Sequence, residues 1–215
     1  MSNVLILADF ISSKATKTNA ELATAAARIG EVTAVVLAPA GKGAAMAADI
    51  NKGPVSKIVV VESDAFVNNG VAAAADVLAQ IIAAQSPAAV LIASHAFGKE
   101  VAARYIHAHS DRAHGPFIIV NSASIAPDQM ENLLFGSEST KPQEGEGLFA
   151  QANGGSIYFD EIADMHLETQ SKILRVLVDQ QFQRPGSHDL VELEMRVISS
   201  TSRDLPAAIE QKSSG

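Results

Sequence analysis

Two short motifs contain the residues whose types and spacing could bind a nucleotide. Gly98-Lys99-Glu100 follows an apolar run and opens a helical pattern, as at the end of a phosphate-binding loop. Asp160-Glu161 ends a second apolar run. A lysine at a helix start adds positive charge to the helix dipole, and paired carboxylates supply Mg²⁺ ligands and a base. We therefore predict cofactor binding at Gly98, Lys99 and Glu100, a metal ligand at Asp160, and a vestigial catalytic role for Glu161.

The first motif lacks most of its glycines. The sequence Ala-Ser-His-Ala-Phe occupies positions 93–97, where a phosphate-binding loop needs glycines so that consecutive backbone N–H groups can turn inward. The Cβ atoms of Ala93 and Ala96, with the bulk of His95 and Phe97, would obstruct that approach. The motifs thus predict one nucleotide half-site beside a damaged second half.

Composition favours an α/β protein. The chain has 215 residues, 47% hydrophobic and 19% charged, with no tryptophan and two tyrosines. That length and apolar content suffice to bury a core as one large domain or two small ones. The net charge of −8 argues against direct nucleic-acid binding, and the absence of cysteine excludes disulfides and thiolate metal sites.

The first residues predict a cytoplasmic protein. Met-Ser-Asn-Val-Leu-Ile-Leu-Ala-Asp has no basic region, and its apolar run is too short for a signal peptide or a membrane span. We therefore expect no membrane partner.

Short Val/Ile/Leu runs alternate with Ala-rich helical patterns, which is typical of repeated βα units. Helices are predicted at 18–29, 42–49, 69–84, 98–109, 127–134 and 167–180, a small hairpin at 182–194, and a mobile loop at 136–147. The predicted strands are Val4–Ala8, Thr33–Leu37, Lys57–Val61, Ala89–Ala93, Phe117–Asn121, Ser156–Phe159 and Arg196–Ser200. Right-handed crossovers then give a doubly wound, mainly parallel α/β sheet of about seven strands with helices on both faces. Ligands in such a sheet bind at the carboxyl ends of the strands.

The first half of the chain resembles the amino-terminal domain of the electron transfer flavoprotein alpha subunit. The motifs that carry this resemblance are Val4-Leu-Ile-Leu-Ala-Asp9, Ala34-Val-Val-Leu37, Ser56-Lys-Ile-Val-Val-Val61 and the run from Ser86 to Arg104. In that family FAD is held mainly by a carboxy-terminal domain that this chain does not contain. The resemblance therefore implies that FAD is not expected here.

The second half resembles the AAA+ ATPase domain of sigma-54-dependent response regulators. The matching motifs are Gly98-Lys-Glu-Val-Ala-Ala-Arg-Tyr-Ile-His107, Gly115–Ser124, Glu131-Asn-Leu-Leu-Phe-Gly136, Gly147–Gly155, Asp160-Glu-Ile-Ala-Asp-Met165, Ile173-Leu-Arg-Val-Leu177 and Arg196–Leu205. The resemblance implies that Lys99 contacts β- and γ-phosphates, that Asp160 holds Mg²⁺, and that Glu161 polarises the attacking water.

The chain departs from that family in several places. Ser202 stands where many relatives have a sensing asparagine, and the Gly-Ala-Phe-Thr-Gly-Ala loop that engages the sigma factor is absent from 136–147. The sequence ends at Gly215, before the region of the arginine fingers and the helical lid. Because an arginine finger is worth orders of magnitude in phosphoryl transfer, efficient ATP hydrolysis is not expected.

We interpret the chain as an engineered chimera of a flavoprotein-like half, residues 1–104, and a truncated AAA+-like half, residues 98–215. The two would form a single composite domain over residues 1–215, because sharing one central strand pairs sheet edges that would otherwise be exposed. If both halves keep their usual order, numbering the seven predicted strands in sequence gives 3-2-1-4-7-6-5.

Three functions stay open at this stage. The first is a scaffold with no complete active site and no certain cofactor. The second is weak Mg²⁺–ATP binding through the residual half-site. The third is an interaction module, either self-associating or keeping a parental surface, although the sigma factor and the flavoprotein beta subunit are expected to be lost as partners.

Other ionisable residues have simpler explanations. The spacing of His107, His109 and His114 does not place all three on one helical face, which argues against a metal site. Arg175 and Arg184 resemble positions near the subunit boundary of ring ATPases, but solvated charges explain them more simply.

Overall fold

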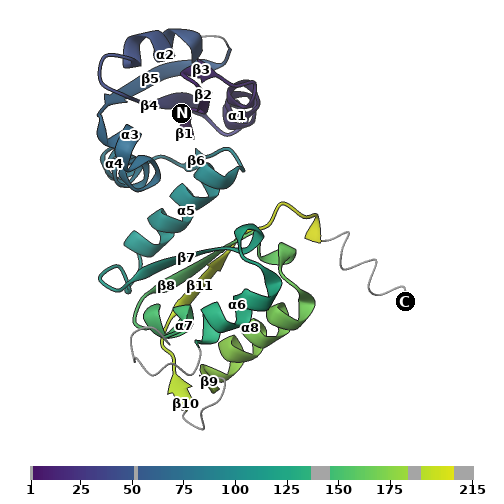
Figure 1. The fold of residues 1–215 in the computed structure, drawn as a ribbon. Coiled ribbons are helices and arrows are strands. Elements are labelled where there is room, and N and C mark those ends of the chain that lie inside the picture. The colour runs from purple at the N-terminus through teal and green to yellow at the C-terminus, as the bar shows by residue number, and fades with distance from the viewer. Residues whose placement is uncertain (1, 51–52, 137–145, 184–189, 206–215) are drawn as a thin grey trace. The chain divides into compact units, whose positions relative to one another are not determined.

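The computed structural model describes residues 2–50, 53–136, 146–183 and 190–205 (Figure 1). The chain divides into two compact units, Met1–Tyr105 (unit 1) and Ile106–Gly215 (unit 2). Each unit has its own parallel sheet with helices packed on it, so the predicted α/β class is confirmed. The boundary lies beside residue 104, the predicted end of the flavoprotein-like half.

Unit 1 is built on a four-stranded parallel sheet in the order β5-β4-β1-β6. The strands are β1 (Asn3–Leu7), β4 (Glu31–Ala38), β5 (Val55–Glu62) and β6 (Ala89–Leu91). The connecting helices are α1 (Thr18–Ala27), α2 (Gly43–Ile50), α3 (Ala65–Asn68) and α4 (Gly70–Gln85), and α5 (Ala96–Ala108) follows β6 and extends across the boundary between the units. A hairpin of β2 (Phe10–Ile11) and β3 (Lys14–Ala15) follows β1.

Helices cover both faces of this sheet, as expected for a doubly wound fold. On β1, Val4 and Ile6 point to one face and pack with buried residues of α1 and α2. Leu5 and Leu7 point to the other face and pack with α4 and with Val101 of α5. Because successive strand residues alternate between faces, a strand buried on both sides must be apolar throughout, which explains the unbroken Val-Leu-Ile-Leu run.

Unit 2 contains a three-stranded parallel sheet in the order β11-β8-β7. The strands are β7 (Phe117–Asn121), β8 (Ser156–Asp160) and β11 (Arg196–Ser199). The helices are α6 (Pro127–Phe135), α7 (Leu148–Gln151) and α8 (Leu167–Asp179), with 3-10 turns η1 (Ser122–Ser124) and η2 (Ile162–Asp164). The predicted hairpin is present as β9 (Gln181–Gln183) paired antiparallel with β10 (Leu190–Glu192); its turn lies outside the described residues.

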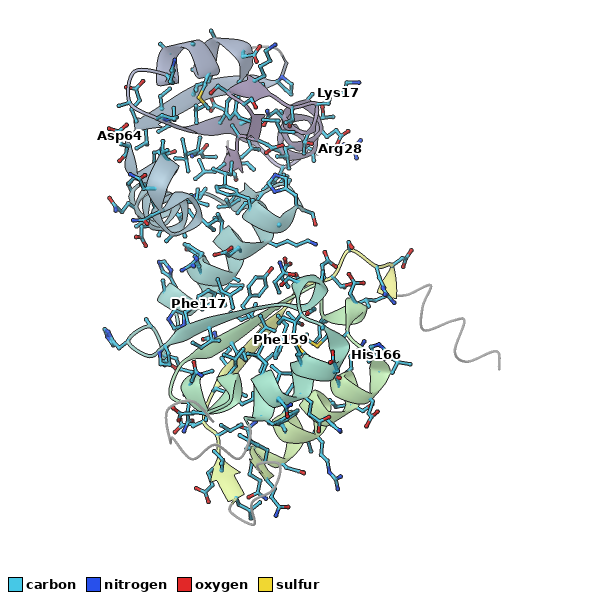
Figure 2. All side chains as sticks on the ribbon, in the orientation of Figure 1. Lys17, Arg28, Asp64, Phe117, Phe159 and His166 are labelled. Carbon is cyan, nitrogen blue, oxygen red and sulfur yellow. The ribbon has the colours of Figure 1, made fainter. Side chains whose placement is uncertain are left out.

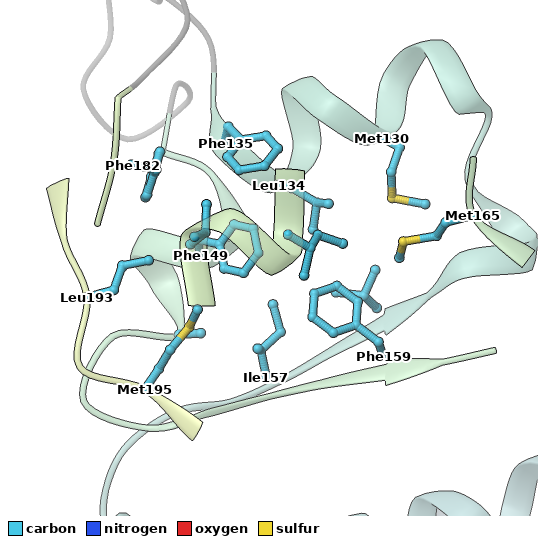
Figure 3. Close-up of a cluster of buried hydrophobic side chains, with 14 residues drawn as sticks. Met130, Leu134, Phe135, Phe149, Ile157, Phe159, Met165, Phe182, Leu193 and Met195 are labelled. Carbon is cyan, nitrogen blue, oxygen red and sulfur yellow. The ribbon is translucent and has the colours of Figure 1, made fainter. Parts of the chain in front are cut away.

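One face of the unit 2 sheet packs against an aromatic core. Figure 3 shows this cluster, in which the rings of Phe135, Phe149, Phe159 and Phe182 lie among Met130, Met165 and Met195. Strand alternation places Phe117, which is in register with Ser156, on the opposite face from Phe159; both are labelled in Figure 2. On the face that carries Phe117, its ring stacks on that of Tyr158, with ring centroids 6.5 Å apart.

The structure confirms all seven predicted strands and all six predicted helices, with small changes at their ends. It also corrects the predicted topology, because the strands belong to two sheets instead of one continuous sheet. The predicted order holds within each sheet, as 3-2-1-4 in unit 1 and as 7-6-5 in unit 2. The fourth predicted strand is shorter than expected, since β6 ends at Leu91, and a strand of three residues offers only a short ladder for pairing. Most of the predicted mobile loop, residues 137–145, lies outside the described residues.

Among the described residues, no helix has both the length and the apolar character that crossing a membrane requires.

Candidate functional site

Strand β8 carries two carboxylates to the carboxyl edge of the unit 2 sheet. Asp160 is the last residue of β8 and shares a face with Tyr158. Its Oδ1 atom accepts hydrogen bonds from the Tyr158 hydroxyl, at 3.1 Å, and from the Ser200 hydroxyl, at 2.8 Å. Tyr158 is only 2% exposed, so these bonds fix the Asp160 carboxylate against a buried side chain.

Glu161 follows Asp160 in a left-handed backbone conformation, with φ 54° and ψ 52°. Its Oε2 atom accepts hydrogen bonds from the backbone N–H of Ser202, at 2.7 Å, and from the Ser202 hydroxyl, at 3.0 Å. The structure therefore brings Ser202, where the resemblance leads us to expect a sensing asparagine, into contact with the predicted catalytic glutamate.

The segment after β11 organises this edge through its backbone as well. The N–H of Ser200 donates to the carbonyl of Phe159, and the N–H of Ile162 donates to the carbonyl of Ser200. Sequence reasoning missed Ser200, although a serine one residue beyond a parallel strand next to β8 was a usable signal.

Two carboxylates at a strand end can contribute to a Mg²⁺ site, which takes its remaining ligands from water or phosphate. Within the described part of the chain, no cluster of three or more His, Asp or Glu residues forms a ready-made metal site.

The second predicted motif lies in unit 1, where the connection from β6 to α5 is short. β6 ends at Leu91 and α5 begins at Ala96, so Gly98 lies within the first turn of the helix. A Cβ atom built on Gly98 would stand 2.1 Å from the carbonyl oxygen of Ala93 and 2.8 Å from Cγ2 of Ile92. Glycine at this position thus allows the helix to pack closely on the preceding backbone.

Two backbone donors in the first turn of α5 are already engaged. The N–H of Gly98 donates to Nδ1 of His95, at 3.3 Å, and the N–H of Lys99 donates to the carbonyl oxygen of His95, at 2.9 Å. The side chain of Glu100 forms an ion pair with Arg104 at 2.8 Å, and Lys99 is half-buried on the helix. Gly98, Lys99 and Glu100 belong to unit 1, whereas Asp160 and Glu161 belong to unit 2.

His95 is held by a cluster that sequence reasoning did not find. Since its Nδ1 accepts the Gly98 N–H, its Nε2 carries the proton and donates to Oδ1 of Asp9, at 2.9 Å. The Thr16 hydroxyl donates to the other carboxylate oxygen of Asp9, at 2.7 Å. The sequence did contain a usable signal. Asp9 follows β1 and His95 follows β6, and these neighbouring parallel strands have their carboxyl ends at the same edge of the sheet.

Two of the other ionisable residues singled out in the sequence contact neighbouring side chains. His107 is buried, with Nδ1 2.9 Å from the Ser156 hydroxyl and its ring centroid 5.1 Å from that of Phe117. Arg175 is largely exposed and lies 3.8 Å from Asp179, and Arg184 lies outside the described residues.

Comparison with curated proteins finds bacterial transcription regulators. Nitrogen assimilation regulatory protein NtrX of Azorhizobium caulinodans is 50% identical over 113 residues, which cover 52% of this chain and 25% of that protein. Regulatory protein AtoC of Escherichia coli is 43% identical over 133 residues, covering 60% of this chain and 29% of that protein. The chain thus spans only a quarter to a third of the length of these relatives.

Among solved structures, NtrX from Brucella abortus matches with a TM-score of 0.50 and 24% identity, covering 98% of this chain and 63% of that chain. At this identity the likeness shows the fold alone.

Two family models match the sequence itself. The electron transfer flavoprotein domain matches residues 4–105, and the sigma-54 interaction domain matches residues 66–214. The flavoprotein match covers slightly less than half of the chain, whereas the sigma-54 match covers more than half, so the chain belongs to the sigma-54 interaction domain family.

Proposed function

We propose that this chain is a catalytically incomplete relative of sigma-54-dependent transcription regulators, a composite scaffold that does not hydrolyse ATP. The observation that carries this proposal is the connection between β6 and α5. Gly98 lies inside the helix, and a Cβ there would meet the Ala93 carbonyl at 2.1 Å, so its role is close packing. A phosphate-binding loop instead requires a longer connection whose backbone N–H groups converge on the ligand.

The energetics of phosphoryl transfer support this proposal. Catalysis in this class depends almost entirely on positioning and on stabilising charge around the transferred phosphoryl group. With the N–H groups of Gly98 and Lys99 bonded to His95, they are not directed at a phosphate. A carboxylate pair without such a cradle can attract Mg²⁺ but cannot orient the nucleotide.

We further propose that the chain joins two parental halves through one shared βα element, as an engineered chimera would. The two family matches support this idea because they overlap over residues 66–105, the segment that includes α4 and β6. A joint within this overlap would let each sheet form from its own strands, as β5-β4-β1-β6 and β11-β8-β7 do.

The test is calorimetric titration of the full chain with Mg²⁺–ATP, combined with an ATPase assay. We expect hydrolysis at the buffer rate, and we expect Lys99→Ala to leave any nucleotide affinity within about threefold of the parent chain. Glu100→Ala serves as a matched control on the same helix turn. A tenfold or larger loss of affinity on Lys99→Ala alone, or turnover that depends on Glu161, would overturn the proposal.

A second candidate function is weak Mg²⁺ or Mg²⁺–nucleotide binding at the end of β8. The observation in its favour is that both hydrogen bonds that Asp160 accepts from described residues go to its Oδ1 atom. This candidate predicts that Asp160→Asn abolishes a Mg²⁺-dependent heat signal that Lys99→Ala preserves. If neither variant changes the titration, β8 has no metal-binding role.

A further inference from the structure

A cavity of about 550 Å³ lies in unit 1 at the carboxyl end of its sheet. Asp9, Pro39 and His95, which line it, follow β1, β4 and β6, and α4 contributes Gly70 and Ala74. These strands and α4 are labelled in Figure 1. After β1 the chain adds β4 and β5 on one side and then β6 on the other, so the strand order reverses at β1. Open α/β sheets bind ligands in the crevice at this reversal.

The wall of this cavity is mainly apolar and rich in rings. Phe10, Phe66 and Phe97 line it together with Leu7 and Leu37. Small-molecule sites usually enclose about 300–1,000 Å³ and combine such walls with a few fixed polar groups. Size and lining together fit a small molecule that contains an aromatic ring, since rings stack on or pack edge-to-face against phenylalanine.

The charge of the cavity comes from Asp9. This carboxylate is 15% exposed and is held in place by His95 on one oxygen and by Thr16 on the other. Each carboxylate oxygen can accept a further hydrogen bond, so Asp9 keeps acceptor capacity toward the cavity. Among the described residues that line the cavity there is neither lysine nor arginine, so an anionic ligand would meet an uncompensated negative charge.

We propose that this cavity binds a small aromatic amine. Its ring packs among Phe10, Phe66 and Phe97, and its ammonium or N–H group donates a hydrogen bond to Asp9. Nearby phenylalanine faces add cation–π attraction for a charged amine. Every residue that lines this site belongs to unit 1, so its test does not depend on the carboxylates of unit 2.

Tryptamine and indole-3-propionate are suitable probes because they share the indole ring and carry opposite charges. The chain has no tryptophan, so indole fluorescence reports the probe without a tryptophan background from the protein. Anisotropy titrations of the full chain should show tryptamine binding at least about tenfold more tightly than indole-3-propionate. Absence of tryptamine binding up to millimolar concentration, or equal affinity for both probes, would overturn the proposal.

Two variants test the geometry. A Cβ built on Gly70 meets no atom within 4 Å, so the backbone accepts a side chain there. Gly70 lines the cavity, and we expect Gly70→Leu to occupy part of it and to abolish binding of both probes. Gln80→Leu, an exposed position on the same helix, is the matched control and should bind as the parent chain does. Asp9→Asn should reduce the preference for tryptamine to about threefold or less. Thermal unfolding shows whether Asp9→Asn folds. If it does not fold, Gly70→Leu still tests the proposal, because unchanged binding by Gly70→Leu would refute the proposed site.

Discussion

The two units pack parallel sheets with different kinds of side chain. In unit 1 the buried residues on both faces of the sheet are aliphatic, and alanines such as Ala23, Ala26 and Ala74 face the strands from the helices. In unit 2 the core on one face is aromatic, with the ring centroid of Phe149 5.3 Å from Phe135 and 6.1 Å from Phe159 and Phe182. Small side chains let a helix approach a sheet closely, whereas rings fill a wider space.

This difference in packing predicts where each unit is sensitive to substitution. Burial of an aliphatic side chain contributes roughly 1.5–3 kcal/mol, and unit 1 divides its burial among many small residues. Unit 2 buries much of its apolar surface in a few large aromatic side chains, and truncation of one of them leaves a larger cavity. We therefore expect unit 2 to depend on single residues and unit 1 to depend on close backbone approach.

The largest effect is expected from Phe149→Ala. Phe149 is fully buried and contacts three other rings, so its removal should lower the free energy of unfolding of unit 2 by about 3–5 kcal/mol. Hydrogen exchange resolved by peptide, with urea titration, measures the two units separately. Val178→Ala, at a position 73% exposed, should change stability by less than about 0.5 kcal/mol. A loss of less than about 1 kcal/mol for Phe149→Ala would contradict the idea of a concentrated core.

Gly98→Ala should have the next largest effect and tests close approach in unit 1. The added Cβ would meet the Ala93 carbonyl at 2.1 Å, so backbone must shift, and we expect a cost of about 1–3 kcal/mol. Gly70→Ala is the matched control, since it meets open space and should be neutral or stabilising by up to about 1 kcal/mol. Equal thermal midpoints for the two alanine variants would show that Gly98 is not needed for packing.

Ser200→Ala probes the polar edge of unit 2. It removes a hydroxyl that bonds Asp160 and lies 3.0 Å from the Tyr158 hydroxyl, and the expected cost is about 1 kcal/mol. A double-mutant cycle with Tyr158→Phe should give a coupling of at least about 0.5 kcal/mol by urea denaturation. Additive effects would mean that the three groups do not act as one network.

The smallest effect concerns Lys172 of α8. Its hydrogen bond to Glu131, at 2.8 Å, and then its contact with Glu168 raise the pKa of Lys172 above the ordinary 10.5. A raised pKa in the folded state means that this contribution is fully present below pH 10.5 and is lost as pH rises through the folded pKa. Lys172→Met should therefore lower the thermal midpoint slightly at about pH 8 and by less at about pH 11. A difference that does not change with pH would contradict the ion-pair origin.

The sequence was sufficient to predict the main strands, because residues such as Val4 and Ile157 belong to apolar runs that only a buried strand explains. The hairpin of β2 and β3 could not be predicted in this way. Its strands have two residues each, and its turn places Ser12 and Ser13 at positive φ without any glycine. Helices α3 and α7, of four residues each, are too short to show a helical period.

The candidate site was predicted in part. Asp160 and Glu161 lie at the strand end, as their place after an apolar run indicated, but their serine partners come from a segment 40 residues away. The role of Gly98 depends on where α5 begins. The predicted start at 98 left room for a phosphate-binding loop, whereas the observed start at Ala96 places the glycine inside the helix. Helix ends are the least certain feature of a sequence pattern. The assignment of Gly98 to a phosphate-binding loop stays a prediction.

The left-handed backbone of Glu161 has an evolutionary consequence. A non-glycine residue in that conformation costs about 1 kcal/mol, which glycine does not incur. In a laboratory population selected only for soluble expression, drift at this position should favour Gly or Asn, and the carboxylate would disappear early. In a population selected for a function that uses the edge of β8, Glu161 would persist despite its conformational cost. The frequency of glutamate at this one codon would thus record which selection the protein had experienced.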